Sequence, residues 1–265
     1  MLLGKDSPAP EQYAPEILYP IPRRLARDEL GLPETLPFHG EDIWHAWELS
    51  WLDGEGAPVA AVARFSVPST SENLVESKSF KLYLNSLNQE AFENTEAMKA
   101  TVVKDLSAVA KGDIAVELLD VDDASLAPTA MPGECVDAAP MAALASEPEP
   151  GLLELSAAPG ESQQLYSHGL RSLCPVTAQP DWATVVLSCN GVKVDPGSLR
   201  RYVASFRHHQ EFHEQCVERM YRDLQAAGLE SFSVQALYTR RGGLDISPWR
   251  SSEPGQAPRL RSMRQ

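Results

Sequence analysis

The ten residues Val75–Leu84, VESKSFKLYL, recur in a diverged form later in the chain. At one constant offset, five positions in or just after this stretch match the same or a similar residue: Val75, Ser79, Lys81, Tyr83 and Ser86 correspond to Val194, Ser198, Arg200, Tyr202 and Ser205. A second match, of Asp105-Leu106 with Asp223-Leu224, is one residue out of phase. Such a repeat indicates an old tandem duplication, so we expect two similar halves in this chain of 265 residues.

Both halves show the same predicted order of elements, β-β-α-α-β. In the first half, alternating and helical spacings predict strands at 43–51 and 59–65, a helical stretch at 75–84, a helix from Thr95 and a strand at 114–119. In the second half they predict strands near 164–173 and at 183–189, a helix from Asp195-Pro196, a helix carrying Phe212, Cys216, Met220 and Leu224, and a strand at 232–238.

Local signals mark the ends of several elements. Asp53–Gly56 and Asn190-Gly191 both have the composition of tight turns. Thr95 is the expected cap of its helix, and Gly112 lies just past the helix end. The apolar face of this helix is predicted to consist of Met98, Val102, Leu106 and Val109.

Proline-rich stretches without apolar periodicity divide the chain. Residues 1–40 are expected to form an N-terminal arm that is partly ordered at best, and residues 121–150 to form a linker. The predicted domains are therefore a first module at 41–120 and a second, catalytic module at 151–265.

Composition favours a small molecule as the partner. The formal net charge of −14 argues against direct binding of nucleic acid, which needs a basic surface. No apolar run approaches the roughly 18 residues that span a bilayer, and the N-terminus lacks the apolar region of a signal peptide. The four widely spaced cysteines form no C-x-x-C pair, so we expect free thiols and a cytoplasmic location.

The segment 174–182, CPVTAQPDW, holds a thiol and a carboxylate seven positions apart, with two prolines between them. Prolines restrict the backbone, which limits how far Cys174 and Asp181 move apart. A thiol beside a proton acceptor can act as a nucleophile. By itself the pair is weak, because a lone cysteine is more often a small buried apolar residue.

A histidine-rich segment precedes the last predicted helix. His209, His213 and Cys216 have the spacing of one helical face and are candidate zinc ligands, but Cys216 also lies on the apolar stripe and no H-E-x-x-H pattern is present. Glu214 and, in the first half, Glu76 could each accept two parallel hydrogen bonds from a guanine-like base. A solvated acid at a helix end is the plainer alternative for both.

A cationic turn follows the last predicted strand. Arg240-Arg241-Gly242-Gly243 combines two cations with two residues that adopt positive φ freely, and Lys78 and Lys81 add positive charge in the first half. This composition suits a phosphate-bearing cofactor, although an ordinary turn with solubilising charges would look the same. No Rossmann or P-loop motif is present.

Taken together, four stretches resemble the long, two-module form of the 7-cyano-7-deazaguanine reductases, the NADPH-dependent nitrile reductases of queuosine biosynthesis. They are residues 76–83, 172–182, 205–214 and 238–243, and the resemblance extends over nearly the whole chain from about Asp42. The resemblance implies an α+β fold of tandem tunnelling-fold (T-fold) modules, each an antiparallel sheet with two helices packed on one face. It also implies a homodimer.

The same resemblance implies roles for individual residues. Cys174 would form a covalent thioimide with the nitrile, Asp181 would donate the proton, and His213 would assist proton transfer. The implied substrate-binding residues are Val75, Glu76, Ser77, His213 and Glu214. The implied NADPH-binding residues are Ser77, Lys78, Arg241 and Gly242, and no metal is expected.

Two other functions stay open at this point. One is a zinc-dependent purine or pterin hydrolase of the same fold, which would rest on His209, His213 and Cys216. The other is a non-enzymatic ligand-binding protein, for which Cys174 would be dispensable.

Overall fold

Neither of the two structural units is a single run of the chain. The computed structural model describes residues 2, 4 and 9–265. The first unit contains the described residues of Met1–Asp28, Asp42–Leu126 and Arg240–Asp245, and the second contains Glu29–Glu41, Ala127–Thr239 and Ile246–Gln265. The cationic turn at 240–243 therefore belongs to the first unit, although it follows the last predicted strand of the second.

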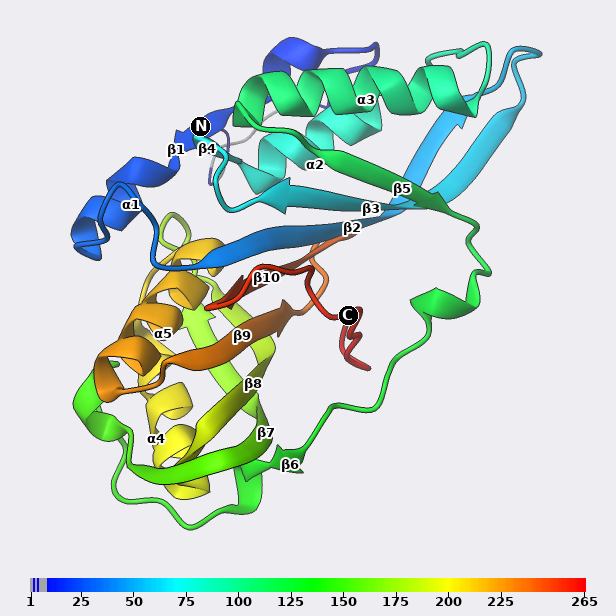
Figure 1. Cartoon of the computed structure of the whole chain (residues 1–265). Coiled ribbons are helices and arrows are strands. Elements are labelled where there is room, and N and C mark those ends of the chain that lie inside the picture. The colour runs from blue at the N-terminus through cyan, green and yellow to red at the C-terminus, as the bar shows by residue number, and fades with distance from the viewer. Residues whose placement is uncertain (1, 3, 5–8) are drawn as a thin grey trace. The chain divides into compact units, whose positions relative to one another are not determined.

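The first unit is built on three neighbouring strands in the order β5-β3-β2. These are β2 (His39–Leu52), β3 (Pro58–Pro68) and β5 (Ala115–Leu119). Two helices, α2 (Ser77–Ser86) and α3 (Thr95–Ala110), lie on one side of these strands (Figure 1). The first unit also contains the short antiparallel pair of β1 (Pro20–Pro22) and β4 (Asn73–Val75), and α1 (Arg23–Glu29) follows β1.

The second unit has strands in the order β10-β9-β8-β7-β6, antiparallel except for β6 with β7. They are β6 (Glu134–Cys135), β7 (Leu155–Leu173), β8 (Pro180–Val194), β9 (Ser231–Tyr238) and β10 (Leu244–Ser251). Helices α4 (Pro196–Ser205) and α5 (His213–Ala227) pack against them, with Leu165, Val185, Val203 and Met220 in the shared core.

Single 3₁₀ turns complete the chain: η1 (Pro15–Ile17), η2 (Ala124–Leu126), η3 (Val136–Ala138), η4 (Pro150–Leu152) and η5 (Phe206–His208). No helix in the described part of the chain is both long and apolar enough to cross a bilayer.

The α+β class and the β-β-α-α-β order in each half are confirmed. The sequence patterns missed β10, α1 and the short strands β1, β4 and β6. The predicted turn at Asn190-Gly191 is wrong, because β8 continues to Val194. Gly191 has a φ of 76° and pairs with Ala158 at the register shift where β7 carries extra residues, so its conformational freedom accommodates this irregularity in strand pairing.

The ends of α3 also differ from the prediction. Asn94 caps the helix by accepting a hydrogen bond from the Ala97 amide at 2.9 Å, and Thr95 is the first helical residue. Ala110, rather than Val109, completes the buried face. Lys111 takes the left-handed conformation at the C-terminal end. A Cβ at Gly112 would lie 2.7 Å from the Ser71 Cβ, so close packing accounts for that glycine.

Paired positions of the sequence repeat make the same hydrogen bonds in the two units. The amides of Ser79 and Ser198 donate to the side chains of Glu76 and Asp195, at 2.6 and 2.7 Å, at the starts of α2 and α4. The hydroxyls of Tyr83 and Tyr202 donate to Asp105 and Asp223 at 2.7 and 2.8 Å. The matched residues thus hold equivalent helices in equivalent ways.

Candidate active site

Cys174 begins the tight loop between β7 and β8. The residues before and after the loop are paired, Leu173 with Pro180 and Ser172 with Asp181. Inside it, the Cys174 amide donates to the Gln179 carbonyl and the Ala178 amide donates to the Cys174 carbonyl, each at 2.9 Å. This short hairpin holds Cys174, which is buried, at the end of one strand and Asp181 near the start of the next.

His213 meets both Asp181 and Tyr238. Its Nε2 lies 3.3 Å from Asp181 Oδ2, and its ring stacks on the Tyr238 ring with centroids 3.9 Å apart and an interplanar angle of 21°. Asp181 is 3% exposed, which excludes most water from the carboxylate. A carboxylate and an imidazole at this separation can share and transfer a proton.

Glu214 follows His213 in the first turn of α5 and is also buried. No side chain caps this helix, because its N-cap residue is Phe212. The partial positive charge of a helix N-terminus favours a carboxylate there. Glu214 is therefore not the solvated helix-end acid that was the plainer alternative.

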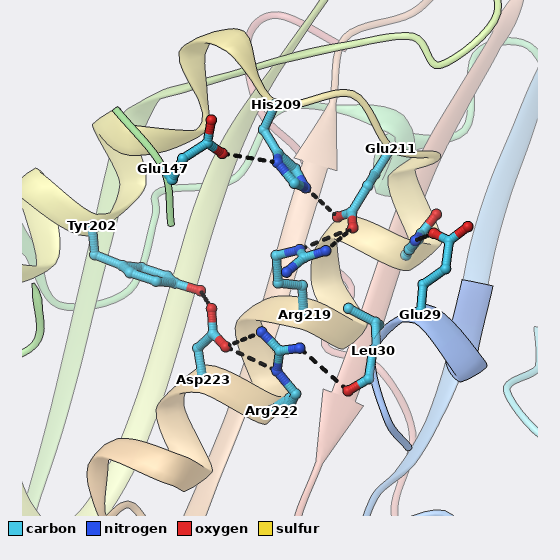
Figure 2. Close-up of polar contacts among 10 residues, drawn as sticks. Glu29, Leu30, Glu147, Tyr202, His209, Glu211, Arg219, Arg222 and Asp223 are labelled. Carbon is cyan, nitrogen blue, oxygen red and sulfur yellow. Dashed lines mark hydrogen bonds and ion pairs between the residues drawn. The ribbon is translucent and has the colours of Figure 1, made fainter. Parts of the chain in front are cut away.

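The segment just before α5 is hydrogen-bonded to Leu173, the last residue of β7 before Cys174. The Leu173 amide donates to the His209 carbonyl at 2.8 Å, and the Glu211 amide donates to the Leu173 carbonyl at 3.2 Å. Figure 2 shows the side chains of this segment: His209 lies between Glu147 and Glu211, and Glu211 accepts hydrogen bonds from Arg219 of α5. Burial opposes ionisation of Glu211, but His209 and the Arg219 guanidinium outweigh it and lower the pKa of this carboxyl.

The candidate zinc ligands do not share one face. His209 follows η5 in an extended conformation and precedes α5, so it does not share a helical face with His213 and Cys216. Cys216 is fully buried, and burial raises the pKa of its thiol. Among the described residues, no group of three or more potential metal ligands comes together.

In the first unit, Glu76 is the N-cap of α2 and is buried. Its amide donates to the Tyr19 carbonyl at 2.9 Å, and its side chain accepts from the Ser79 amide. Val75 ends β4 and Ser77 begins α2, so these three consecutive residues lie at one strand–helix junction.

Gly242 lies against Lys81 in the same unit. Gly242 has a φ of 60°, and a Cβ built on it would come within 2.6 Å of Lys81 Nζ. Trp47 of β2 holds this turn by two contacts. The Arg240 guanidinium lies 3.9 Å from the centroid of the Trp47 ring, and the Trp47 amide donates to the Gly243 carbonyl at 2.9 Å. A glycine beneath a lysine amine, with Arg241 adjacent, fits a phosphate group of a dinucleotide.

Each unit therefore gathers part of the predicted set. In the second unit, Asp181 and His213 come together beside the Cys174 loop. In the first unit, Gly242 lies against Lys81, which belongs to the same helix as Ser77 and Lys78. The contacts of Tyr238, Glu211 and Arg219 were not predicted. Strand alternation placed Tyr238 at the end of the strand predicted at 232–238, and no local pattern pairs it with His213.

Comparisons with known proteins define the class. The family model described as "Nitrile reductase, 7-cyano-7-deazaguanine-reductase N-term" matches residues 9–118, and the model described as "QueF-like protein" matches residues 180–257. Each half of the chain thus matches one of these two models.

Curated relatives specify the family further. A protein from Chromohalobacter salexigens is 50% identical over 97% of this chain and 92% of its own length. One from Teredinibacter turnerae is 51% identical over 95% of this chain and 91% of its own length. One from Dechloromonas aromatica is 51% identical over 97% of this chain and 92% of its own length. Each is named NADPH-dependent 7-cyano-7-deazaguanine reductase. The chain belongs to this family, which confirms the resemblance inferred from its four motifs.

Proposed function

We propose that this protein reduces the nitrile of 7-cyano-7-deazaguanine to the aminomethyl group of 7-aminomethyl-7-deazaguanine, with NADPH as reductant, for tRNA queuosine biosynthesis. Family membership supports the reaction. The observation that carries the chemistry is the 3.3 Å contact of His213 with Asp181 in the unit that holds the Cys174 loop.

Cys174 is the proposed nucleophile. Its sulfur adds to the nitrile carbon, one C–N π bond breaks, and the thiol proton ends on the nitrile nitrogen, which gives a thioimide. Asp181 and His213 relay that proton, so the addition needs no proton from bulk water. Splitting nitrile reduction through a covalent adduct replaces one difficult step by easier ones. Burial of Cys174 and Asp181 would limit hydrolysis of the intermediate.

Glu214 and Glu76 are the proposed acceptors for the base, with Val75, Ser77 and His213 completing its contacts. A carboxylate pairs in two parallel hydrogen bonds with the ring N–H and exocyclic amine of a guanine-like base. Both glutamates are buried, and a buried acceptor discriminates strongly against ligands that lack the matching donors.

Ser77, Lys78, Arg241 and Gly242 are the proposed NADPH contacts, supported by the positions of Ser77 and Lys78 in the first turn of α2 and by the Gly242–Lys81 approach. When bound, NADPH supplies hydride, and two hydrides with two protons convert one nitrile into one primary amine. The cationic side chains would offset the phosphate charge in a chain whose net charge is −14.

We further propose that residues 41–120 and 151–265 form tandem T-fold modules, with residues 1–40 as an arm and 121–150 as a linker, and that the protein is a cytoplasmic homodimer. The repeated Tyr–Asp and Ser–acid hydrogen bonds support the duplicated modules. The four free cysteines suit a reducing compartment. A sedimentation measurement that finds a monomer would contradict the dimer.

Mixing the protein with 7-cyano-7-deazaguanine and following NADPH absorbance tests the function. We expect two NADPH oxidised per amine formed. Without NADPH, intact-mass measurement should find a covalent adduct on the wild-type protein and none on Cys174→Ala, while this variant still binds the base. Absence of NADPH oxidation by the wild-type protein would refute the proposal.

A further inference from the structure

The backbone contact between Leu173 and segment 209–211 has a counterpart in the first unit. There, the Leu52 amide donates to the Glu90 carbonyl and the Phe92 amide donates to the Leu52 carbonyl, both at 2.9 Å. Leu52 and Leu173 each end a long strand, and each pairs in parallel with the residue between its two partners, Ala91 or Gln210. The bridge is therefore part of the scaffold of both units.

The side chains on this bridge differ between the units. By hydrogen-bonding role, Phe92 occupies in the first unit the position that Glu211 occupies in the second. A phenylalanine cannot form an ion pair, yet the first unit makes its bridge with hydrogen bonds of similar length, both 2.9 Å, compared with 2.8 and 3.2 Å in the second unit. The ionic cluster of the second unit is thus not required to form the bridge.

That cluster joins the elements that carry the proposed chemistry. Glu211 bonds by its amide to Leu173, next to Cys174, and by its carboxylate to Arg219 on the helix that begins with His213 (Figure 2). His209 Nε2 lies 3.0 Å from Glu211 Oε2, and its Nδ1 lies 3.6 Å from Glu147. Glu211 therefore links the strand that ends before the nucleophile, through its backbone amide, to the helix that starts with the proton-transfer residue, through its carboxylate.

We propose that Glu211 is a positioning residue that sets the placement of Cys174 relative to His213 and Glu214, with Arg219 as its partner. This inference rests on the proposed function. Ion pairs and hydrogen bonds to charged groups in a buried setting hold geometry more tightly than neutral contacts. A displacement of about 1 Å between reacting groups can cost on the order of 100-fold in rate.

Asp223 provides a matched control. It is a fully buried carboxylate on α5 that accepts hydrogen bonds from Tyr202, at 2.8 Å, and from Arg222, at 3.0 Å. Figure 2 shows this second acidic cluster beside the first. Asp223→Asn therefore perturbs a similar buried cluster on the same helix. Unlike Glu211, Asp223 forms no part of the backbone bridge between segment 209–211 and Leu173.

The test compares Glu211→Gln, which keeps the shape and removes the charge, with Asp223→Asn and Arg219→Lys. Two quantities are measured: the rate of adduct formation with 7-cyano-7-deazaguanine in the absence of NADPH, by intact mass, and kcat against KM. We expect Glu211→Gln to slow both adduct formation and kcat by about 10- to 100-fold, with the KM for NADPH changed less than about twofold. Arg219→Lys keeps the positive charge, so its rate of adduct formation and its kcat should fall less than those of Glu211→Gln.

The proposal is overturned if Glu211→Gln forms the adduct at the wild-type rate, or if Asp223→Asn slows it equally. If Glu211→Gln does not fold, Arg219→Gln replaces it with the same expected outcome. Failure of the proposed function would appear differently, as a wild-type protein that forms no adduct and oxidises no NADPH. In that case the rate of Cys174 alkylation by iodoacetamide, compared between wild type and Glu211→Gln, still tests whether Glu211 positions the loop.

Discussion

His213 Nε2 lies 3.3 Å from Asp181 Oδ2, although one residue begins a helix and the other lies near the start of a strand. The contact forms because β8 and β9 are paired, which brings Tyr238 opposite Ala183 and stacks its ring on the His213 imidazole. An acid, an imidazole and an aromatic ring thus form one cluster beside the Cys174 loop.

Replacing Asp181 by Asn should disable proton transfer and leave the fold intact. An amide of the same shape cannot take up or release the proton, so we expect kcat to fall by about 100-fold or more. Steady-state NADPH oxidation measures the loss. Asp137→Asn is the control, because Asp137 also accepts hydrogen bonds in this unit, from Ser167 at 2.6 Å and the His168 amide at 2.9 Å. An equal loss in both variants would contradict the role of Asp181.

Tyr238→Leu and Tyr238→Phe separate the ring from the hydroxyl. The buried hydroxyl lies beside the Cys216 thiol and the Ser172 hydroxyl, so Phe loses only these polar contacts and keeps the stack on His213. Leu removes the stack, which contributes about 0.5–1.5 kcal/mol in aromatic pairs. We expect kcat to fall roughly tenfold more in Leu than in Phe. Equal activities would show that the stack does not orient His213.

Gly242→Ala should weaken NADPH binding selectively. The added Cβ would meet Lys81 Nζ at 2.6 Å and would also sit on a residue with a φ of 60°. We expect the KM for NADPH to rise by about tenfold or more, with adduct formation in the absence of NADPH unchanged. Gly56→Ala carries the same kind of backbone strain, at a φ of 83°, with nothing within 4 Å of the new Cβ. A comparable rise in KM for Gly56→Ala would exclude the steric explanation.

The stabilising effect of Glu211 should depend on pH. Its pKa is lower in the folded protein than the value of about 4.3 in an unfolded chain, so its contribution is complete above that value and is lost as pH falls through the folded pKa. We expect Glu211→Gln to lower the free energy of unfolding by about 1–3 kcal/mol near neutral pH, and by less at about pH 4. Denaturant unfolding at the two pH values measures the difference. If the difference in free energy of unfolding between wild type and Glu211→Gln were larger at about pH 4 than near neutral pH, it would contradict the lowered pKa.

Local signals predicted most of the fold. Asp195-Pro196 marked the start of α4 correctly, because an N-cap and the proline after it act within a few residues. The turn predicted at Asn190-Gly191 is wrong because its outcome depends on a distant strand and not on its neighbours in the sequence. A residue with positive φ suits a turn and a bulge equally, and pairing of β7 along β8 decides between them.

Residue types and their spacing determined the α+β class, the repeat, and the four motifs that identify the family, since each depends on neighbours along the chain. Only the tertiary structure decided that His213 meets Asp181, that Phe92 and Glu211 occupy matching places, and that Lys81 covers Gly242. These contacts join residues that strand pairing and helix packing bring together, and no periodicity in a sequence records the distance between such residues.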